Sequence, residues 1–165
     1  MEKFSPAPPL DLQANDPRLN GFLSFSGLKT KELEILLKLA DTVVCPSGTS
    51  IIREGEEGYC LYVLLEGTAT VQAEGMELAT LRAGDFFGEV SLVDEGCRSA
   101  TVLADTPCNL LRLTRVTLGV LAGLEPMAAV QILSAIGKGL VARLRAGNRK
   151  YLDLLHAAPR EPSIH

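Results

Sequence analysis

Four residues between positions 84 and 102 have the chemistry needed to bind a phosphate and a sugar. This segment, GDFFGEVSLVDEGCRSATV, places Glu89 and Arg98 nine residues apart among apolar residues. Gly88 lets backbone N–H groups approach a ligand, and the residues after it can form a short helical turn that attracts phosphate. Arg98 can bind a phosphate through two parallel hydrogen bonds, and Ser99 adds a hydroxyl. The segment therefore indicates a phosphate site.

Glu89 has to be explained separately, because a carboxylate repels phosphate. A carboxylate accepts hydrogen bonds well from ribose hydroxyls, so Glu89 and Arg98 together suggest a sugar phosphate as ligand. On the residues alone, an ion pair between Glu89 and Arg98 that ties a turn to a strand is an equally good explanation. The spacing does not choose between them.

The segment must be positioned by a body made of strands. From Thr42 to Thr114, short apolar or alternating runs are divided by glycine turns, which is typical of an antiparallel sandwich or closed barrel of jelly-roll type. Before it, an apolar stripe predicts an amphipathic helix that starts near Thr30, formed by Leu33, Leu36, Leu37 and Ala40.

Helical spacing returns after Thr114, first over residues 115–125 and then from Pro126 to about Leu155, since proline suits the first turn of a helix. The second helix has an apolar stripe with the three-four spacing of a coiled coil. It is formed by Val130, Leu133, Gly137, Leu140, Leu144, Gly147, Tyr151 and Leu154. The stripe fits two alternatives, packing on the protein's own barrel or a dimer interface.

Composition narrows the class of protein. A chain of 165 residues with 47% hydrophobic and 22% charged residues predicts one soluble domain. The first seventeen or so residues are rich in proline and predict a flexible or loosely docked arm. Neither a signal peptide nor an apolar run of about 20 residues is apparent, which favours a cytoplasmic protein.

Metal and redox chemistry are disfavoured by the few cysteines and histidines. The four cysteines are spread singly and are expected to be reduced core thiols, at positions 45, 60, 97 and 108. His156 and His165 both lie beyond the barrel, which argues against a cupin-like metalloenzyme and a haem sensor.

Charge is distributed unevenly around a net value of −4. Between Arg53 and Glu95 the only bases are Arg53 and Arg82, against acids at positions 54, 56, 57, 66, 74, 77, 85, 89, 94 and 95. Residues 138–150 hold five bases and no acid. A solvated helix face, or attraction to the acidic barrel, explains these bases better than nucleic acid or lipid binding. The chain also leaves too few residues after the long helix for a helix-turn-helix, so no DNA-binding domain is expected.

At these residues the sequence resembles the cyclic-nucleotide-binding domain, which occurs in the catabolite activator protein, in regulatory subunits of cyclic-AMP-dependent kinase and in cyclic-nucleotide-gated channels. The phosphate-binding cassette of that family has the pattern F-G-E-[LIV]-[ASG]-L, a spacer, then P-R-[AST]-A-[TSW]-V. Residues 87–92 (FGEVSL) and 98–102 (RSATV) match it, with Cys97 in place of the proline. The resemblance extends from Gly21 to about Tyr151.

The resemblance implies a role for each residue of the site. Arg98 would bind the cyclic phosphate and Glu89 the ribose 2′-hydroxyl. The other expected contacts are Gly88, Val90, Ser91 and Ser99 at the phosphate, Val71, Leu78, Leu81 and Val102 in the apolar wall, and Leu140, Arg143 and Leu144 in a lid formed by the long helix. Ser99 favours cyclic AMP over cyclic GMP, because a threonine there often accompanies cyclic GMP in the family.

The sequence thus predicts a mixed α and β fold, an antiparallel jelly-roll-like β-barrel flanked by an N-terminal helical lead-in and two C-terminal helices, the last one long. The expected divisions are an arm over 1–20, a cyclic-nucleotide-binding domain over 21–156 (barrel 42–114, C-terminal helices 115–156) and a tail over 157–165. The expected function is a stand-alone, non-enzymatic receptor for cyclic AMP or cyclic GMP that signals to a protein effector and uses no cofactor. A homodimer through the long helix is possible, and the alternative function is an interaction or dimerisation module that no longer binds nucleotide.

Overall fold

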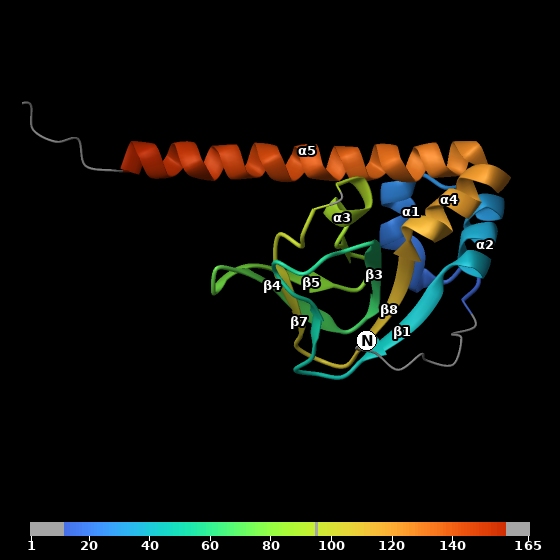
Figure 1. Ribbon diagram of the computed structural model, residues 1–165, viewed down its shortest axis with the longest axis horizontal. Helices are drawn as coiled ribbons and strands as arrows, with labels where there is room; N and C mark the ends of the chain where they lie inside the picture. Colours follow the sequence, from blue (N-terminus) through green and yellow to red (C-terminus); the bar gives the residue numbers. More distant parts are fainter. Residues whose placement is uncertain (1–11, 95, 158–165) are drawn as a thin grey trace, which may run out of the picture.

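The computed structural model describes residues 12–94 and 96–157, in which eight strands form two antiparallel four-stranded sheets (Figure 1). The strand order is β1-β8-β3-β6 in one sheet and β2-β7-β4-β5 in the other. The strands are β1 (Asp41–Cys45), β2 (Ser50–Ile52), β3 (Cys60–Glu66), β4 (Thr68–Ala73), β5 (Met76–Arg82), β6 (Phe86–Phe87), β7 (Thr101–Ala104) and β8 (Cys108–Thr114). The prediction of an antiparallel jelly-roll-like body over residues 42–114 is confirmed.

Strand β3 lies at the centre of the hydrophobic core, because both of its faces are covered. Leu61, Val63 and Leu65 pack under the helices, whereas Tyr62 and Leu64 point between the two sheets. Successive side chains of a strand point to opposite faces, so a strand covered on both sides is a continuous apolar run. The sequence CLYVLL has this form.

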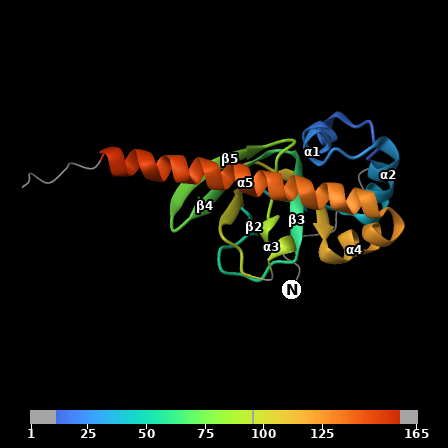
Figure 2. The same cartoon turned by 90° about the horizontal axis from the view of Figure 1, so that it is seen from above.

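The helices gather at one end of the strands. They are η1 (Pro17–Leu19), α1 (Asn20–Ser26), α2 (Thr30–Leu39), α3 (Val90–Val93), α4 (Arg115–Leu124) and α5 (Pro126–Ala157). The starts predicted for α2 and α5 are confirmed, and the side chain of Thr114 caps α4 by accepting a hydrogen bond from the N–H of Thr117 at 3.0 Å. Helix α5 crosses the whole described structure, with α1 and α2 on one side of its first half and α4 on the other (Figure 2).

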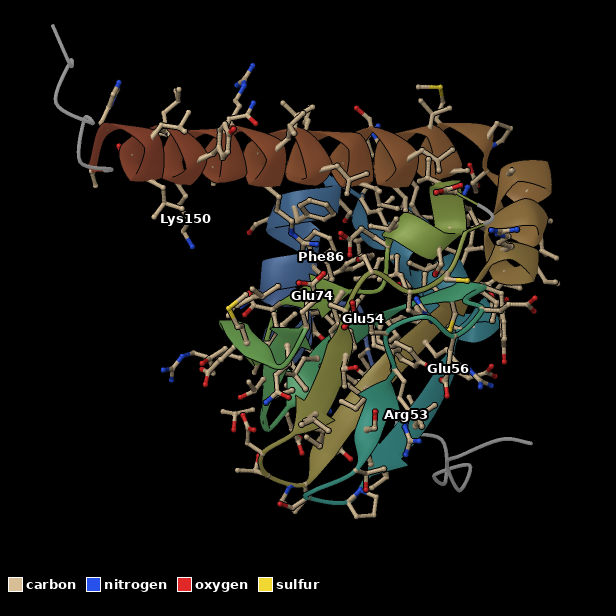
Figure 3. The ribbon with its side chains drawn as sticks, turned by 60° about the vertical axis from the view of Figure 1, so that its left-hand side comes forward. Arg53, Glu54, Glu56, Glu74, Phe86 and Lys150 are labelled. Carbon is tan, nitrogen blue, oxygen red and sulfur yellow. The ribbon has the colours of Figure 1, made fainter. Side chains whose placement is uncertain are left out.

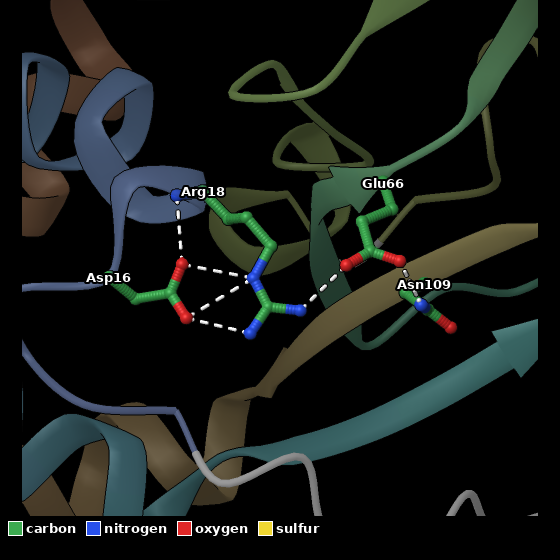
Figure 4. Close-up of polar contacts among 4 residues, drawn as sticks. All are labelled: Asp16, Arg18, Glu66 and Asn109. Carbon is green, nitrogen blue, oxygen red and sulfur yellow. Dashed lines mark hydrogen bonds and ion pairs between the residues drawn. The ribbon is translucent and has the colours of Figure 1, made fainter.

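The end of the predicted N-terminal arm is part of the folded body. Leu19 is fully buried in the core, and Arg18 joins Asp16 to Glu66 of β3 through hydrogen bonds of 2.6 to 3.1 Å (Figure 4). These hydrogen bonds lower the pKa of the Asp16 and Glu66 carboxyl groups. Residues 12–20 thus dock on the folded body, as one of the two alternatives for the arm expected, and residues 1–11 lie outside the described residues.

Most of the apolar stripe expected on α5 is exposed, although Leu140 packs against the core. The residues of α5 buried against the domain are Ala128, Ala129, Ile132, Ala135 and Ile136. From the expected stripe, Val130, Leu144 and Leu154 are 55%, 64% and 70% exposed. Three of these five inward residues are alanines, whose small side chains let the helix lie close to its neighbours. Several of the larger apolar residues remain on the outer side of the helix.

Helix α5 is also long and apolar enough, by length and composition alone, to cross a membrane, with a mean hydropathy of 1.4 over 18 residues. Only 28% of that window is buried within the domain, and one helix of this kind is weak evidence for a membrane span.

Three of the four cysteines are buried, at positions 45, 60 and 108, and Cys97 is exposed. Burial raises the pKa of the Cys45 and Cys108 thiols, which keeps them protonated and unreactive. The prediction of core thiols is wrong for Cys97, because that residue lies in the exposed turn before Arg98, where it forms a backbone bridge with Glu57.

Candidate functional site

A cavity of about 780 Å³ lies between the sheet that contains β4, β5 and β7, the segment after β6, and helix α5. Eleven of the residues predicted for the site line it, namely Val71, Leu78, Leu81, Gly88, Glu89, Val90, Ser91, Arg98, Ser99, Val102 and Arg143. The cavity also contacts residues that were not predicted, which are Ile52, Ala79, Asp85, Phe86, Phe87, Ala100, Ala146, Gly147 and Lys150. Strands and helix thus bring the two halves of the cassette together.

Arg98 lies in this cavity with only 8% of its surface exposed. Its Nη1 donates hydrogen bonds to the carbonyl oxygens of Cys60 at 2.9 Å and Gly88 at 2.8 Å, and to the Ser91 hydroxyl at 2.6 Å. Its Nη2 contacts only the Cys60 thiol, at 3.4 Å, and Nε has no hydrogen-bond partner within residues 12–94 and 96–157. One edge of the guanidinium is therefore held by the protein, and the other remains available to an anion.

Two glycines make room for this arrangement. A Cβ atom on Gly58 would lie 2.5 Å from Arg98 Nε, and one on Gly88 would lie 2.7 Å from Arg98 Nη1. Gly88 also has a φ of 77°, which side chains disfavour. We call Gly58 and Gly88 the glycine cradle. The sequence indicated Gly88, but Gly58 was missed, since a glycine in the turn EEGY does not differ from an ordinary loop glycine.

Glu89 is 2% exposed and forms an ion pair with Arg143 of α5. Arg143 also donates to the Phe86 carbonyl at 3.4 Å and lies 5.7 Å above the Phe86 ring, which stacks on Phe25 of α1. A buried carboxylate requires a charged partner, and this partner comes from the helix over the cavity. The alternative of an ion pair with Arg98 is not what the structure shows, because the guanidinium of Arg98 is directed to carbonyl oxygens instead.

A second arginine contacts the phosphate segment from the other side. Arg115, the first residue of α4, donates to the carbonyl of Ser91 from Nη2 at 2.7 Å and to that of Asp94 at 3.1 Å. These carbonyls belong to the end of the short helix α3, where positive charge is favoured. The sequence did not indicate Arg115, because its partners lie more than twenty residues away.

The predicted lid is placed differently from the expectation. Leu140, near the middle of α5, packs against the hydrophobic core, and Leu144 is 64% exposed. Neither lines the cavity, because the side of α5 that faces it continues from Arg143 through Ala146 and Gly147 to Lys150. Leu144 is one residue past Arg143 and is therefore rotated by about 100° around the helix.

The polar groups of the cavity offer hydrogen bonds and charge rather than metal ligands. Among residues 12–94 and 96–157, no group of three or more His, Cys, Asp or Glu side chains could hold a metal ion. The cavity instead combines a half-free buried guanidinium, a buried carboxylate and an apolar wall. This combination suits a phosphorylated sugar that carries an apolar ring.

Comparisons with known proteins identify a family for the barrel. Residues 42–122 match the family model of the cyclic nucleotide-binding domain. The chain is 37% identical over 92 residues to a "cAMP-dependent protein kinase regulatory subunit" of Emericella nidulans, which covers 54% of this chain and 22% of the relative. It is 32% identical over 142 residues to the "Cyclic AMP receptor protein" of Thermus thermophilus, which covers 83% of this chain and 63% of the relative. The chain thus spans about a fifth of the first relative's length and under two thirds of the second's.

The fold has a similar counterpart among solved structures. A cyclic nucleotide-binding domain from Methylobacillus flagellatus superposes with a TM-score of 0.74, at 22% identity, and covers 87% of this chain and 86% of that one. At this identity the likeness concerns the fold alone. Residues 42–122 of this chain therefore form a domain of the cyclic nucleotide-binding domain family.

Proposed function

We propose that this domain is a receptor for a cyclic mononucleotide, with cyclic AMP as the first candidate and cyclic GMP as the second. The observation that carries the proposal is the state of Arg98, whose guanidinium is buried and anchored on one edge. Among the described residues, Nη2 and Nε face no acceptor other than the Cys60 thiol. A buried guanidinium held in this way is suited to a phosphate with two oxygens available. No catalytic role and no cofactor belong to the proposal.

The two relatives support cyclic AMP, because the names of both contain this nucleotide. In the proposal, the cyclic phosphate binds Arg98 and Ser99, together with the backbone at Gly88, Val90 and Ser91. Glu89 accepts a hydrogen bond from the ribose 2′-hydroxyl, and Val71, Leu78, Leu81 and Val102 contact the base.

Two arginines connect the proposed nucleotide site to the C-terminal helices α4 and α5. Arg115 joins the end of α3 to the start of α4, and Arg143 joins Glu89 to α5. A ligand that draws α3 towards its phosphate therefore acts on both helices. The shift in their equilibrium is limited by the difference in ligand affinity between the two arrangements.

A protein partner of these helices is part of the proposal, and a second copy of the chain is the first candidate. The exposed stripe with Val130, Leu144, Tyr151 and Leu154 keeps coiled-coil spacing along α5. Sedimentation equilibrium of the protein and of a Leu144→Glu, Leu154→Glu variant tests it, since a dimer through this stripe should dissociate in the variant. Within the proposal, the domain acts in the cytoplasm and signals through these helices.

Isothermal titration of refolded, nucleotide-free protein with cyclic AMP and cyclic GMP tests the function. Arg98→Ala should weaken binding by about 2 to 5 kcal/mol, because a buried charge loses its partner, and this corresponds to roughly thirty- to several-thousand-fold. Arg53→Ala is the matched control, because Arg53 is an exposed arginine at the end of β2 that does not line the cavity. Absence of heat with either nucleotide, in protein shown to be folded, would favour the alternative of a module that no longer binds nucleotide.

A further inference from the structure

Helix α5 covers the cavity with one continuous side of three turns. Arg143, Ala146, Gly147 and Lys150 all line the cavity, and their spacing of three, four and seven residues places them on one side of a helix. Seven residues of helix rise about 10 Å, so Arg143 and Lys150 stand at two separate points of this roof. Figure 3 shows Lys150 pointing from α5 to the same side of the helix as Phe86.

The roof between these two cations is free of bulky side chains. Ala146 and Gly147 have the smallest side chains, and even a Cβ added to Gly147 would meet no atom within 4 Å. Val71, Leu78 and Ala79, from strands β4 and β5, form apolar lining of the same cavity. A flat aromatic ring fits between an apolar wall and a roof of this kind.

Lys150 has no assigned role in the fold. Within residues 12–94 and 96–157 its ammonium group makes no hydrogen bond or ion pair. Arg143, at the other end of the roof, is already bound to Glu89 and to the Phe86 carbonyl. Asp85 also lines the cavity, but its Oδ2 accepts a hydrogen bond from the N–H of Arg82 at 2.8 Å. The free side-chain group on the roof is therefore a pure donor.

We infer that Lys150 contacts the base of the bound nucleotide and favours a 6-oxopurine, such as guanine or hypoxanthine, over adenine. The inference rests on the proposed function. With the phosphate at Arg98 and the ribose beside Glu89 and Arg143, the ring extends below Ala146 and Gly147, and its far edge reaches Lys150. The guanine edge presents two acceptors, O6 and N7, whereas adenine presents one acceptor and an amino donor that an ammonium group repels. This chemistry opposes the preference for cyclic AMP that Ser99 and the names of the relatives suggest.

The test is the affinity of three nucleotides for the full chain and two variants. Cyclic GMP, cyclic IMP and cyclic AMP are titrated into the unchanged protein, Lys150→Met and the control Lys138→Ala. Lys150→Met keeps an apolar stem of similar length and removes the charge, and Lys138 is an exposed lysine of α5 that does not line the cavity. Cyclic IMP lacks the 2-amino group of cyclic GMP, so it separates the contact at O6 and N7 from contacts elsewhere on guanine.

In Lys150→Met we expect cyclic GMP and cyclic IMP to lose about three- to tenfold in affinity and cyclic AMP less than twofold, with no change in Lys138→Ala. Equal losses for all three nucleotides would overturn the inference, because the ammonium group would then act on the shared phosphate or ribose. Unchanged affinities in Lys150→Met would also overturn it and leave Lys150 as a solvated residue, while the proposed receptor function would stand. If the unchanged protein binds none of the three, the proposed function fails and the inference fails with it.

Discussion

Glu89 and Arg143 form an ion pair that joins the floor of the cavity to the helix above it. Only 2% of the Glu89 side chain is exposed, compared with 54% of the Arg143 side chain. Glu89 is therefore buried in the domain, whereas Arg143 reaches it from the solvent side. The carboxylate suited to a ribose hydroxyl is thus already bound to α5. If the proposed ribose contact forms, the ribose hydroxyl and Arg143 would share the carboxylate oxygens of Glu89.

Glu89→Ala is expected to weaken binding of a ribonucleotide by about 1.5 to 3 kcal/mol, the contribution of one hydrogen bond to a charged group. A 2′-deoxy cyclic nucleotide lacks the hydroxyl that Glu89 would accept, so its affinity should hardly change. Titration of both ligands into both proteins checks this expectation. Equal losses for the two ligands would contradict the role assigned to Glu89.

Arg143→Ala is expected to loosen α5 in the absence of nucleotide. The variant leaves the buried Glu89 carboxylate without its cation, and because Arg143 is half exposed we expect a loss of about 1 to 2 kcal/mol in the free energy of unfolding. Hydrogen exchange should accelerate over residues 139–157. Arg145→Ala is the matched control, since Arg145 is an exposed arginine of the same helix that does not line the cavity. Similar exchange in both variants would show that α5 is held by its apolar face alone.

Gly58→Ala is expected to disable the phosphate site without removing a hydrogen-bonding group. The added methyl would lie 2.5 Å from Arg98 Nε and 2.7 Å from Ser91 Cβ, so the guanidinium has to move. We expect at least a tenfold loss in nucleotide affinity, because a displaced guanidinium can no longer form two parallel hydrogen bonds with the phosphate. The control is Gly137→Ala, at which an added Cβ meets no atom within 4 Å and which should raise helix stability by up to about 1 kcal/mol. Unchanged affinity in Gly58→Ala would mean that Arg98 does not bind the phosphate in its observed position.

Arg18 is expected to make stability depend on pH at the acidic end. It lowers the pKa values of Asp16 and Glu66 below their ordinary values of 3.8 and 4.5. A carboxyl group whose pKa is lowered in the folded protein stabilises the fold at pH values above its pKa in the unfolded chain. This stabilisation is lost as the pH falls through its pKa in the folded protein.

The difference in unfolding free energy between the protein and Arg18→Met should therefore be present at pH 7 and shrink below about pH 4. Half of the Glu66 side chain is in solvent, at 49% exposure, so screening limits the difference to about 1 kcal/mol or less. Thermal unfolding at several pH values measures it. Arg82→Met, which removes an exposed arginine without an ion pair in the described residues, should show no such dependence.

The sequence by itself determined the local features of this protein. Alternating apolar runs and glycine turns predicted the sheets, and the helical periodicity predicted α2, α4 and α5. The spacing of Gly88, Glu89 and Arg98 indicated a phosphate site. These features follow from which residues lie near one another along the chain, and local periodicity carries that information.

The contacts between distant groups could be found only in the folded protein. Arg98 takes Cys60 and Gly58 as neighbours, Glu89 takes Arg143, and Arg115 reaches Ser91, all through contacts between separate elements. The side of α5 that faces the cavity also required the structure, because a helix with apolar residues on two sides has no rotation that its sequence alone selects. The close approach of its alanine face to the core fixes that rotation, turns Arg143 and Lys150 to the cavity and leaves Leu144 outside.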